Sequence, residues 1–177
     1  MSEKVKKEVM EWVKVFALAI VFALIITQFI KPTLVRGASM YSTLEEGDYL
    51  IINRMSYKFK EPDHGDIIVF ESDLKQDDGS IKDLVKRVIG VGGDHVVIEN
   101  SKVYVNDKEL NEPYIHNEIT KGDIDIVVPE GKVFVLGDNR EISLDSRYEQ
   151  VGFIDDSDIL GKVVIRLYPF NKIGLID

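Results

Sequence analysis

Hydrophobic and polar positions divide the chain into two parts. Residues 12–30 read WVKVFALAIVFALIITQFI, an apolar run broken only by Lys14 near one end and by Thr27 and Gln28 near the other. As a helix this run would be about 28 Å long at about 1.5 Å per residue, close to the hydrocarbon thickness of a bilayer. Beyond it, short β-branched segments alternate with Gly, Pro, Asp and Asn. The pattern predicts one membrane-spanning helix followed by a β domain.

The apolar run is expected to remain as an anchor. Lysines lie before its uninterrupted core, at positions 4, 6, 7 and 14, and the positive-inside bias favours a cytoplasmic N-terminus. A cleavable secretory signal is the main alternative, but the run is longer than a typical signal core and no small-x-small site precedes Lys31. A buried core helix is the third reading, disfavoured by apolar residues on all faces. We therefore expect a cytoplasmic tail at 1–11, an anchor at 12–30 and an extracytoplasmic domain at 31–177.

The rest of the chain predicts a mainly antiparallel β domain, a sheet or barrel-like structure. Asn106 to Glu109 is expected to form a tight hairpin turn after a strand at 103–105. Polar stretches at 72–82, which includes a turn at 77–80, and at 111–123 are expected to be loops. The predicted strands are 49–52, 66–71, 84–91, 95–99, 103–105, 124–128, 133–136 and 159–167. The segment 167–170, Leu-Tyr-Pro-Phe, is expected to be core at a strand end, with a lipid-facing patch as the alternative.

Composition narrows the function. The chain has 177 residues, a formal net charge of -9 and no cysteine. The acidic balance argues against a nucleic-acid partner, because such proteins need clustered Lys and Arg. The lack of cysteine excludes thiolate nucleophiles, disulfides and Cys-based metal sites.

Ser39 is the first candidate for chemistry. It lies in Gly-Ala-Ser-Met at 37–40, shortly after the anchor, in a sequence that would otherwise be an ordinary turn. A serine hydroxyl needs a neighbouring base to act as a nucleophile at neutral pH. His64, His95 and His116 have no motif around them, although a Ser-His-Asp triad stays open because its members need not be close in sequence.

Lys86 is the stronger candidate for the base. Strand alternation puts it on one face with Leu84 and Val88, and burial among apolar neighbours lowers the pKa of a lysine. A neutral lysine at pH 7 needs a decrease of about three pKa units, or about 4 kcal/mol. The alternative is an edge strand whose Lys86 and Arg87 reach out to water.

A third element, Gly137 to Tyr148, follows an apolar strand with a dense polar cluster. It is either a solvated, salt-bridged loop or a set of side chains that orients a base. Ser143 is able to contact an amine, and Asp145 is able to pair with Arg147 or Arg140.

Together these elements resemble the bacterial type I signal peptidases, specifically their compact Gram-positive type. The resemblance rests on Ser39-Met40 beyond the anchor, Lys86-Arg87 in an apolar strand, and Gly-Asp-Asn-Arg-x-x-Ser-x-Asp-Ser-Arg at 137–147. It extends over nearly the whole chain, including Gly161-Lys162.

The resemblance implies a serine endopeptidase that removes signal peptides and requires no metal or cofactor. Ser39 is implied as nucleophile, with its backbone N–H in the oxyanion hole, and Lys86 as general base. Catalytic support is implied for a set of loop residues: Asp138, Ser143, which would hydrogen-bond the lysine, and Asp145 with Arg147.

The implied partners are membrane lipid and exported preproteins with small residues at positions -1 and -3. Residues 33–38 and 83–85 are expected to pair with the substrate as strands. The pockets for the small side chains are expected to be lined by Val35, Met40, Leu44 and Val85.

The chain departs from the family pattern at three positions. Gly37 replaces a residue whose hydroxyl assists the oxyanion hole in some relatives, Ser42 stands at a usual proline, and Gly92 replaces the proline of a Pro-Gly-Asp. These departures keep open a specialised or non-catalytic paralogue that assists pilus or surface-protein assembly. Both Ser39 and Lys86 are nevertheless present.

Overall fold

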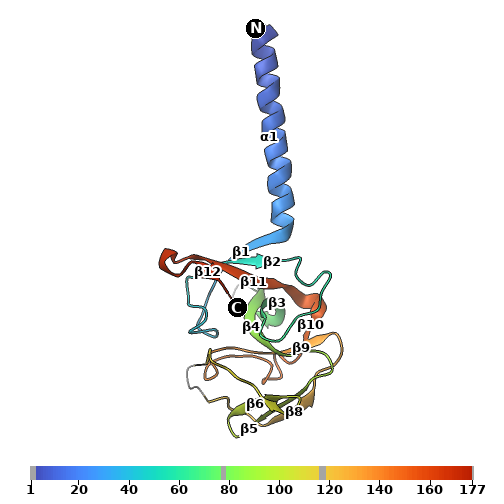
Figure 1. Cartoon of the computed structure of the whole chain (residues 1–177), viewed down its shortest axis with the longest axis vertical. Coiled ribbons are helices and arrows are strands. Elements are labelled where there is room, and N and C mark those ends of the chain that lie inside the picture. The colour runs from blue at the N-terminus through green and yellow to red at the C-terminus, as the bar shows by residue number, and fades with distance from the viewer. Residues whose placement is uncertain (1–2, 77–78, 116–118, 177) are drawn as a thin grey trace.

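A single long helix stands apart from a β domain in the computed structural model, which describes residues 3–76, 79–115 and 119–176 (Figure 1). Helix α1 covers Glu3–Phe29, and its most apolar window has a mean hydropathy of 2.4 with no residue of the window buried. No proline interrupts it, and Pro32 follows within three residues of its end. The helix therefore begins well before residue 12, while the limits of the membrane-embedded part stay a prediction.

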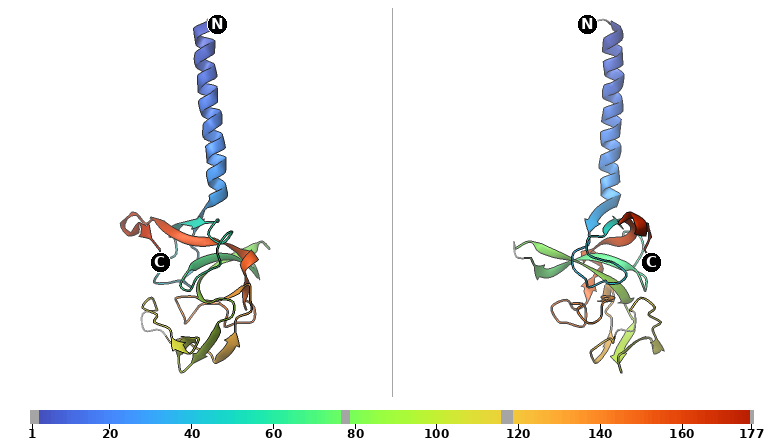
Figure 2. Two further views of the ribbon diagram at one scale, coloured as in Figure 1. Left: turned by 45° about the vertical axis from the view of Figure 1, so that its right-hand side comes forward. Right: turned by 90° about the vertical axis from the view of Figure 1, so that its left-hand side faces the viewer.

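The larger sheet is antiparallel throughout and has the strand order β1-β2-β11-β3-β4-β9-β10, with β12 paired to β11. Its strands are β1 (Ile30–Leu34), β2 (Tyr49–Asn53), β3 (Ile67–Lys75), β4 (Ile81–Gly90), β9 (Lys132–Leu136), β10 (Ile154–Asp155), β11 (Ile159–Tyr168) and β12 (Gly174–Leu175). Two short 3-10 helices, Asp156–Asp158 and Phe170–Lys172, lie before and after β11. In both further views the end of α1 leads directly into this sheet (Figure 2).

A smaller sheet lies at the opposite end of the β domain from α1 (Figure 1). Its order is β7-β6-β5-β8, from β5 (His95–Glu99), β6 (Lys102–Val105), β7 (Lys108–Glu109) and β8 (Ile124–Val127). Asn106 and Asp107 join β6 to β7 with φ angles of 52° and 63°. Both residue types tolerate this left-handed region. The predicted hairpin is confirmed, but its turn is limited to Asn106 and Asp107 because Lys108 and Glu109 already pair as β7.

Three apolar clusters form the core, and two of them contact β4, the strand that carries Lys86. Val35, Met40, Leu44 and Val69 belong to the first cluster, with Val85 packed against it. Leu84 and Val88 belong to the second, with Leu74 packed against it. The third cluster joins the small sheet to β9 through Val96, Ile98, Phe134 and others. Alternation along β4 therefore sends neighbouring side chains into different clusters.

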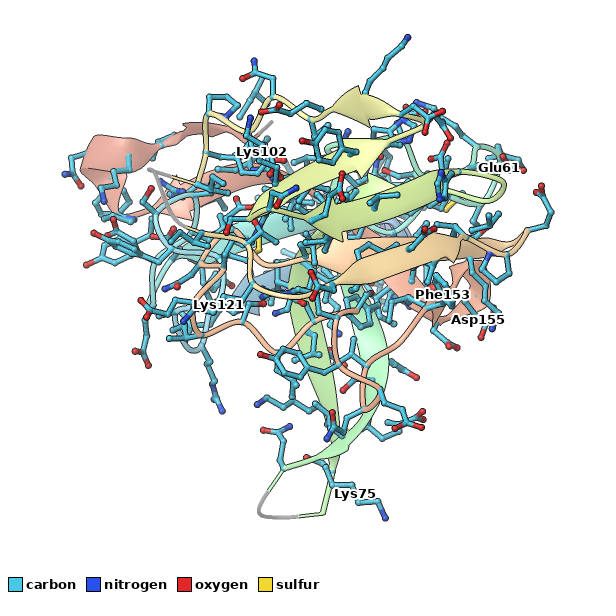
Figure 3. All side chains as sticks on the ribbon, turned by 90° about the horizontal axis from the view of Figure 1, so that it is seen from below. Glu61, Lys75, Lys102, Lys121, Phe153 and Asp155 are labelled. Carbon is cyan, nitrogen blue, oxygen red and sulfur yellow. The ribbon has the colours of Figure 1, made fainter. Side chains whose placement is uncertain are left out.

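The predicted strands are all present, and several expectations are corrected. Strand β1 begins at Ile30, a residue predicted to end the anchor, and β3 and β4 continue into the expected loop at 72–82. The two strands protrude from the sheet as a hairpin, with Lys75 near its tip (Figure 3). Hydrogen bonds join the two strands there, as between Ser72 Oγ and the Lys82 carbonyl at 2.6 Å, and Leu74 packs against the second core cluster. Residues 77 and 78 of the expected turn lie outside the described residues.

The expected loop at 111–123 contains no strand in its described part, and His116 falls outside that part. The prediction that 167–170 is core is wrong. Leu167 and Tyr168 are exposed, and the side chain of Phe170 is 77% exposed. These residues end β11 and begin the turn to β12, where no further layer covers the sheet in the described part of the chain.

Candidate active site

Ser39 lies in a loop that is closed at its base and anchored by two buried side chains. The Val35 amide donates to the Asp48 carbonyl at 2.9 Å, and the Gly47 amide donates to the Val35 carbonyl at 3.0 Å. Within the loop, Met40 and Leu44 are buried in the first core cluster. Gly37 has a φ of +84°, a conformation that favours glycine. The serine is thus presented on a short arch whose next residue is fixed in the core.

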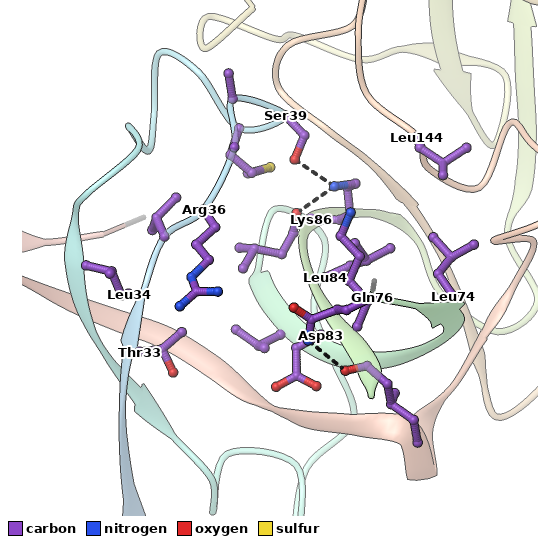
Figure 4. A pocket seen from close by; sticks show the side chains of 18 of the residues that line it. Thr33, Leu34, Arg36, Ser39, Leu74, Gln76, Asp83, Leu84, Lys86 and Leu144 are labelled. Atoms are coloured by element: carbon purple, nitrogen blue, oxygen red, sulfur yellow. Dashed lines mark hydrogen bonds between the residues drawn. The ribbon is translucent and has the colours of Figure 1, made fainter. Parts of the chain in front are cut away.

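Lys86 comes from β4, 47 residues further along the chain, and its side chain meets the serine. The side-chain nitrogen Nζ donates to Ser39 Oγ at 2.8 Å and to the Val85 carbonyl at 3.0 Å. The residue is 1% exposed, although it faces a cavity (Figure 4). Burial therefore excludes the alternative in which Lys86 reaches out to bulk water.

Burial lowers the pKa of Lys86 to about 8. Loss of hydration is the largest cause, and the charge of Lys82 lowers the pKa further. The carboxylates of Asp145 and Asp138 act in the opposite direction. A substantial fraction of Lys86 is consequently neutral near pH 8, where it can accept a proton from the hydroxyl it contacts.

The loop 137–147 carries the expected support residues and fixes them through buried ion pairs. Asp145 accepts hydrogen bonds from the Gly137 amide at 3.0 Å and from Arg147 Nε at 2.8 Å. Asp138 pairs with Arg87, whose Nε and Nη2 lie 2.9 and 2.8 Å from its two carboxylate oxygens. Arg147 and Arg140 were both considered as partners of Asp145, and in the structure Asp145 pairs with Arg147.

The hydrogen bond from Lys86 to Ser143 that the resemblance implied is not formed. Ser143 is buried, but its Oγ has no hydrogen-bond partner among the described residues. Lys86 Nζ instead donates a hydrogen bond to the backbone carbonyl of the preceding residue, Val85.

Three residues to which the sequence analysis assigned no role help to position this loop next to Ser39. The backbone N–H of Asn139 donates to the Ser39 carbonyl, and its side-chain Nδ2 donates to the Ala38 carbonyl, both at 3.1 Å. A Cβ at Gly137 would lie 2.1 Å from Ser143 Oγ and 2.5 Å from the Ser39 carbonyl oxygen, so the loop approaches the serine as closely as glycine allows. Glu112 pairs with Arg140, a residue of the same loop. The motif at 137–140 was the available signal for Gly137 and Asn139, whereas no local pattern marked Glu112.

A cavity of about 430 Å³ opens beside the Ser39 and Lys86 pair. Val35, Met40 and Val85 line it as expected, but Leu44 does not: it is fully buried in the core behind Met40. The expectation that Leu44 lines a substrate pocket is therefore wrong. Residues 33–38 form one side of the cavity and residues 81–86 of β4 form another.

Both of these segments have a free strand edge. Strand β1 is at the edge of the larger sheet, and β4 pairs with β9 only from Arg87 to Gly90. Within the described part of the chain, no strand pairs with residues 81–86 on the β9 side. An extended peptide in the cavity would find main-chain donors and acceptors there.

The described histidines contact carboxylates elsewhere. His64 Nε2 lies 2.6 Å from Asp94, and His95 Nε2 lies 2.7 Å from Asp125 of the small sheet. Neither lines the cavity. Among the described residues, the side chain that is hydrogen-bonded to Ser39 Oγ is thus Lys86 and not a histidine. No group of three or more His, Asp or Glu side chains in this part of the chain could hold a metal ion.

Comparisons with known proteins show which family the chain resembles. Residues 9–168 match the family model described as signal peptidase, peptidase S26. Signal peptidase IB of Staphylococcus aureus is 39% identical, over 94% of this chain and 93% of its own length. Signal peptidase I of Bacillus licheniformis is 37% identical, over 99% of this chain and 97% of its own. A crystal structure of a signal peptidase I from Enterococcus faecalis is 33% identical and covers 58% of this chain and 97% of its own, with a TM-score of 0.48.

Proposed function

This chain belongs to the signal peptidase family, peptidase S26, and on that premise we propose that Ser39 and Lys86 are the catalytic dyad with which it removes signal peptides from exported preproteins. The observation that carries the proposal is the 2.8 Å hydrogen bond between Lys86 Nζ and Ser39 Oγ in a site where burial lowers the pKa of the lysine. A serine nucleophile with an adjacent buried base is the arrangement that acyl transfer requires.

The reaction proceeds through an acyl-enzyme. Ser39 Oγ attacks the carbonyl carbon of the scissile bond while neutral Lys86 takes the hydroxyl proton. The tetrahedral intermediate collapses, the C–N bond breaks, and Lys86 returns the proton to the departing amine of the mature protein. Water then attacks the ester carbonyl while Lys86 accepts its proton. The bond to Ser39 Oγ breaks, Lys86 returns the proton to Oγ, and the signal peptide leaves with a carboxylic acid that ionises in water.

The backbone N–H of Ser39 stabilises the oxyanion in this scheme. Gly37 supplies no hydroxyl, and its φ of +84° makes a serine there strained. Asp138, Asp145 and Arg147 hold the loop in place. Ser143, whose Oγ is unpartnered among the described residues and buried, accepts a hydrogen bond from Lys86 once the lysine has become an ammonium with three donors.

The substrate binds as an extended strand between residues 33–38 and residues 83–85. Val85, Val35 and Met40 form shallow apolar walls that suit small side chains at positions -1 and -3. Asp83 is held by Lys31, with Nζ and Oδ2 3.0 Å apart, at the end of the cavity away from the serine. Large side chains at these two positions would meet buried residues and are disfavoured.

Lipid is the second partner, and the catalytic domain lies on the outer side of the membrane. Helix α1 enters the bilayer with its N-terminus in the cytoplasm. Exposed apolar residues at the end of β11, in the following turn and in β12 rest on the membrane surface; they are Leu167, Tyr168, Phe170, Ile173 and Leu175. The active site then lies near the bilayer, where the hydrophobic helix of a preprotein presents its cleavage region.

Cleavage assays with dyad variants test the assignment. We expect purified full-length protein in detergent to cleave a preprotein, and Ser39→Ala or Lys86→Met to lower the rate by about 10³-fold or more. A Lys108→Met variant is the matched control, since Lys108 is exposed on β7 of the small sheet and does not line the cavity. Undiminished cleavage by either dyad variant, with the fold intact, would show that the dyad is misassigned.

A further inference from the structure

The cavity has a second apolar wall, opposite the one that faces positions -1 and -3. Leu74 and Leu84 line it from the second core cluster, and Ile142 and Leu144 line it from the loop 137–147. In the close-up, Leu144 and Leu74 both lie on the other side of Lys86 from Arg36 (Figure 4). We call these four residues the apolar ledge.

Two members of the ledge are unusually exposed for their residue type. Ile142 is 61% exposed and Leu144 is 37% exposed, so neither is needed to fill the core. Their neighbour Ser143 is buried and Asp145 is completely buried, so the loop is firmly held while these two side chains project. Exposed apolar side chains on a fixed loop beside a reactive group mark a contact surface.

The pairing geometry of β4 decides which substrate residue reaches the ledge. Val85 packs against the first cluster, while Leu84 belongs to the second. A substrate strand on the free edge of β4 alternates its own side chains between the same two faces. If positions -1 and -3 face Val85, Val35 and Met40, position -2 faces the ledge.

We propose that the ledge is a binding subsite for an apolar side chain at position -2 of the signal peptide. This inference rests on the proposed function and adds a substrate preference to it. Small residues at -1 and -3 and a large apolar residue at -2 then define the cleavage sequence that this enzyme prefers.

Peptides with Ala at -1 and -3 and either Leu or Asn at -2 provide the probe. Leu and Asn have nearly the same shape and no charge, so Lys82 and Lys86 do not bias the comparison. Partial burial of a Leu side chain favours binding by about 1.4 kcal/mol, which is a factor of ten. We expect full-length protein in detergent to show a kcat/KM about tenfold higher for the Leu peptide.

The double variant Ile142→Asn/Leu144→Asn should reduce this ratio to below about threefold, mainly through the Leu peptide. Val127→Asn is the matched control, since Val127 is 62% exposed on β8 of the small sheet and does not line the cavity. It should keep the tenfold ratio.

Two results would overturn the inference. Equal kcat/KM for both peptides in the unmodified protein, or an unchanged ratio in the double variant that still cleaves, rejects the ledge and leaves the proposed function intact. Failure of the unmodified protein to cleave either peptide or a full preprotein rejects the proposed function, and the inference with it.

Discussion

At the scale of single residues, the pKa of Lys86 sets the pH range in which this side chain can accept the serine proton. Burial is the main cause of a value near 8, well below the ordinary value for lysine near 10.4. At pH 7 about one molecule in ten therefore carries a neutral Lys86 in the free enzyme. The same carboxylates that hold the loop 137–147 prevent the pKa from falling further.

We expect kcat/KM to rise about tenfold per pH unit below pH 8 and to level off above it, because only neutral Lys86 accepts the serine proton. The measurement is kcat/KM of a soluble peptide between pH 5.5 and 9.5. An acid limb centred near 6.5 would instead indicate a histidine base.

The same shift affects stability with a definite sign. The folded-state pKa lies below the unfolded-state value, so the unfolded chain binds more protons between about pH 8 and 10.5. The contribution of Lys86 to the free energy of unfolding is thus most unfavourable below pH 8 and is relieved as pH rises through that window.

At the scale of elements, residues in the connection between β7 and β8 bind to the loop 137–147 and support it. Arg140 is buried and donates to Thr120 Oγ1 at 2.6 Å, to the Gly137 carbonyl at 2.9 Å and to both carboxylate oxygens of Glu112. The guanidinium of Arg87 lies 3.9 Å from the centre of the Tyr114 ring. The small sheet therefore helps to set the position of the loop that holds the Ser39 carbonyl.

Glu112→Gln removes the charge that compensates buried Arg140 while keeping the side-chain shape. We expect it to lower the free energy of unfolding by about 2 kcal/mol and kcat/KM by about tenfold, since an uncompensated buried charge is costly and the loop loosens. Thermal unfolding and peptide cleavage in detergent are the measurements.

Glu141→Gln is the control for that variant. Glu141 belongs to the loop 137–147, and its carboxylate lies 3.9 Å from Lys121 Nζ, but both side chains are exposed. An exposed pair of this kind stabilises by less than about 1 kcal/mol. Equal effects of the two substitutions would contradict a positioning role for Glu112.

At the scale of the whole molecule, the helix and the exposed apolar residues of the larger sheet lie at the same end of the β domain. Figure 1 shows β1, β2 and β11 next to the end of α1, while the small sheet points away from it. Phe170 and Leu175 are about three-quarters exposed at this end. Lipid contact there would hold the cavity close to the bilayer surface.

Protease added outside intact cells should digest the domain that follows residue 36 and leave a fragment containing α1. The reason is the positive-inside bias of the lysines before the anchor. A cytoplasmic marker protein that survives the treatment shows that the cells are intact. Full protection of the domain in intact cells, followed by digestion after lysis, would reverse the proposed topology.

Phe170→Asn/Leu175→Asn should separate lipid contact from catalysis. We expect cleavage of a bilayer-embedded preprotein in proteoliposomes to fall about tenfold, because the two side chains lose apolar contact with lipid. Cleavage of a soluble peptide in detergent should not change. Val127→Asn, at the far end of the molecule, serves as the control, and equal rates in both assays would argue against a membrane-facing patch.

The local features of the chain were predictable because they depend on neighbours in sequence. An uninterrupted apolar run gives a helix, β-branched alternation gives the strands, and the Asn106-Asp107 turn follows from the φ angles those residues tolerate. The motifs around Ser39 and Lys86 mark both residues as reactive groups. The acidic balance and the absence of cysteine also limit the chemistry that this chain can perform.

Tertiary structure decided everything that depends on contacts between distant segments. Only packing brings Lys86 to Ser39, buries Leu44 behind the cavity, leaves the Ser143 hydroxyl without a partner among the described residues and exposes Phe170. Glu112 had no local signal because its partner Arg140 lies 28 residues away. Sequence thus determined which elements form and which groups can react, whereas the fold determined which of those groups meet, because long-range burial is a property of the assembled sheets.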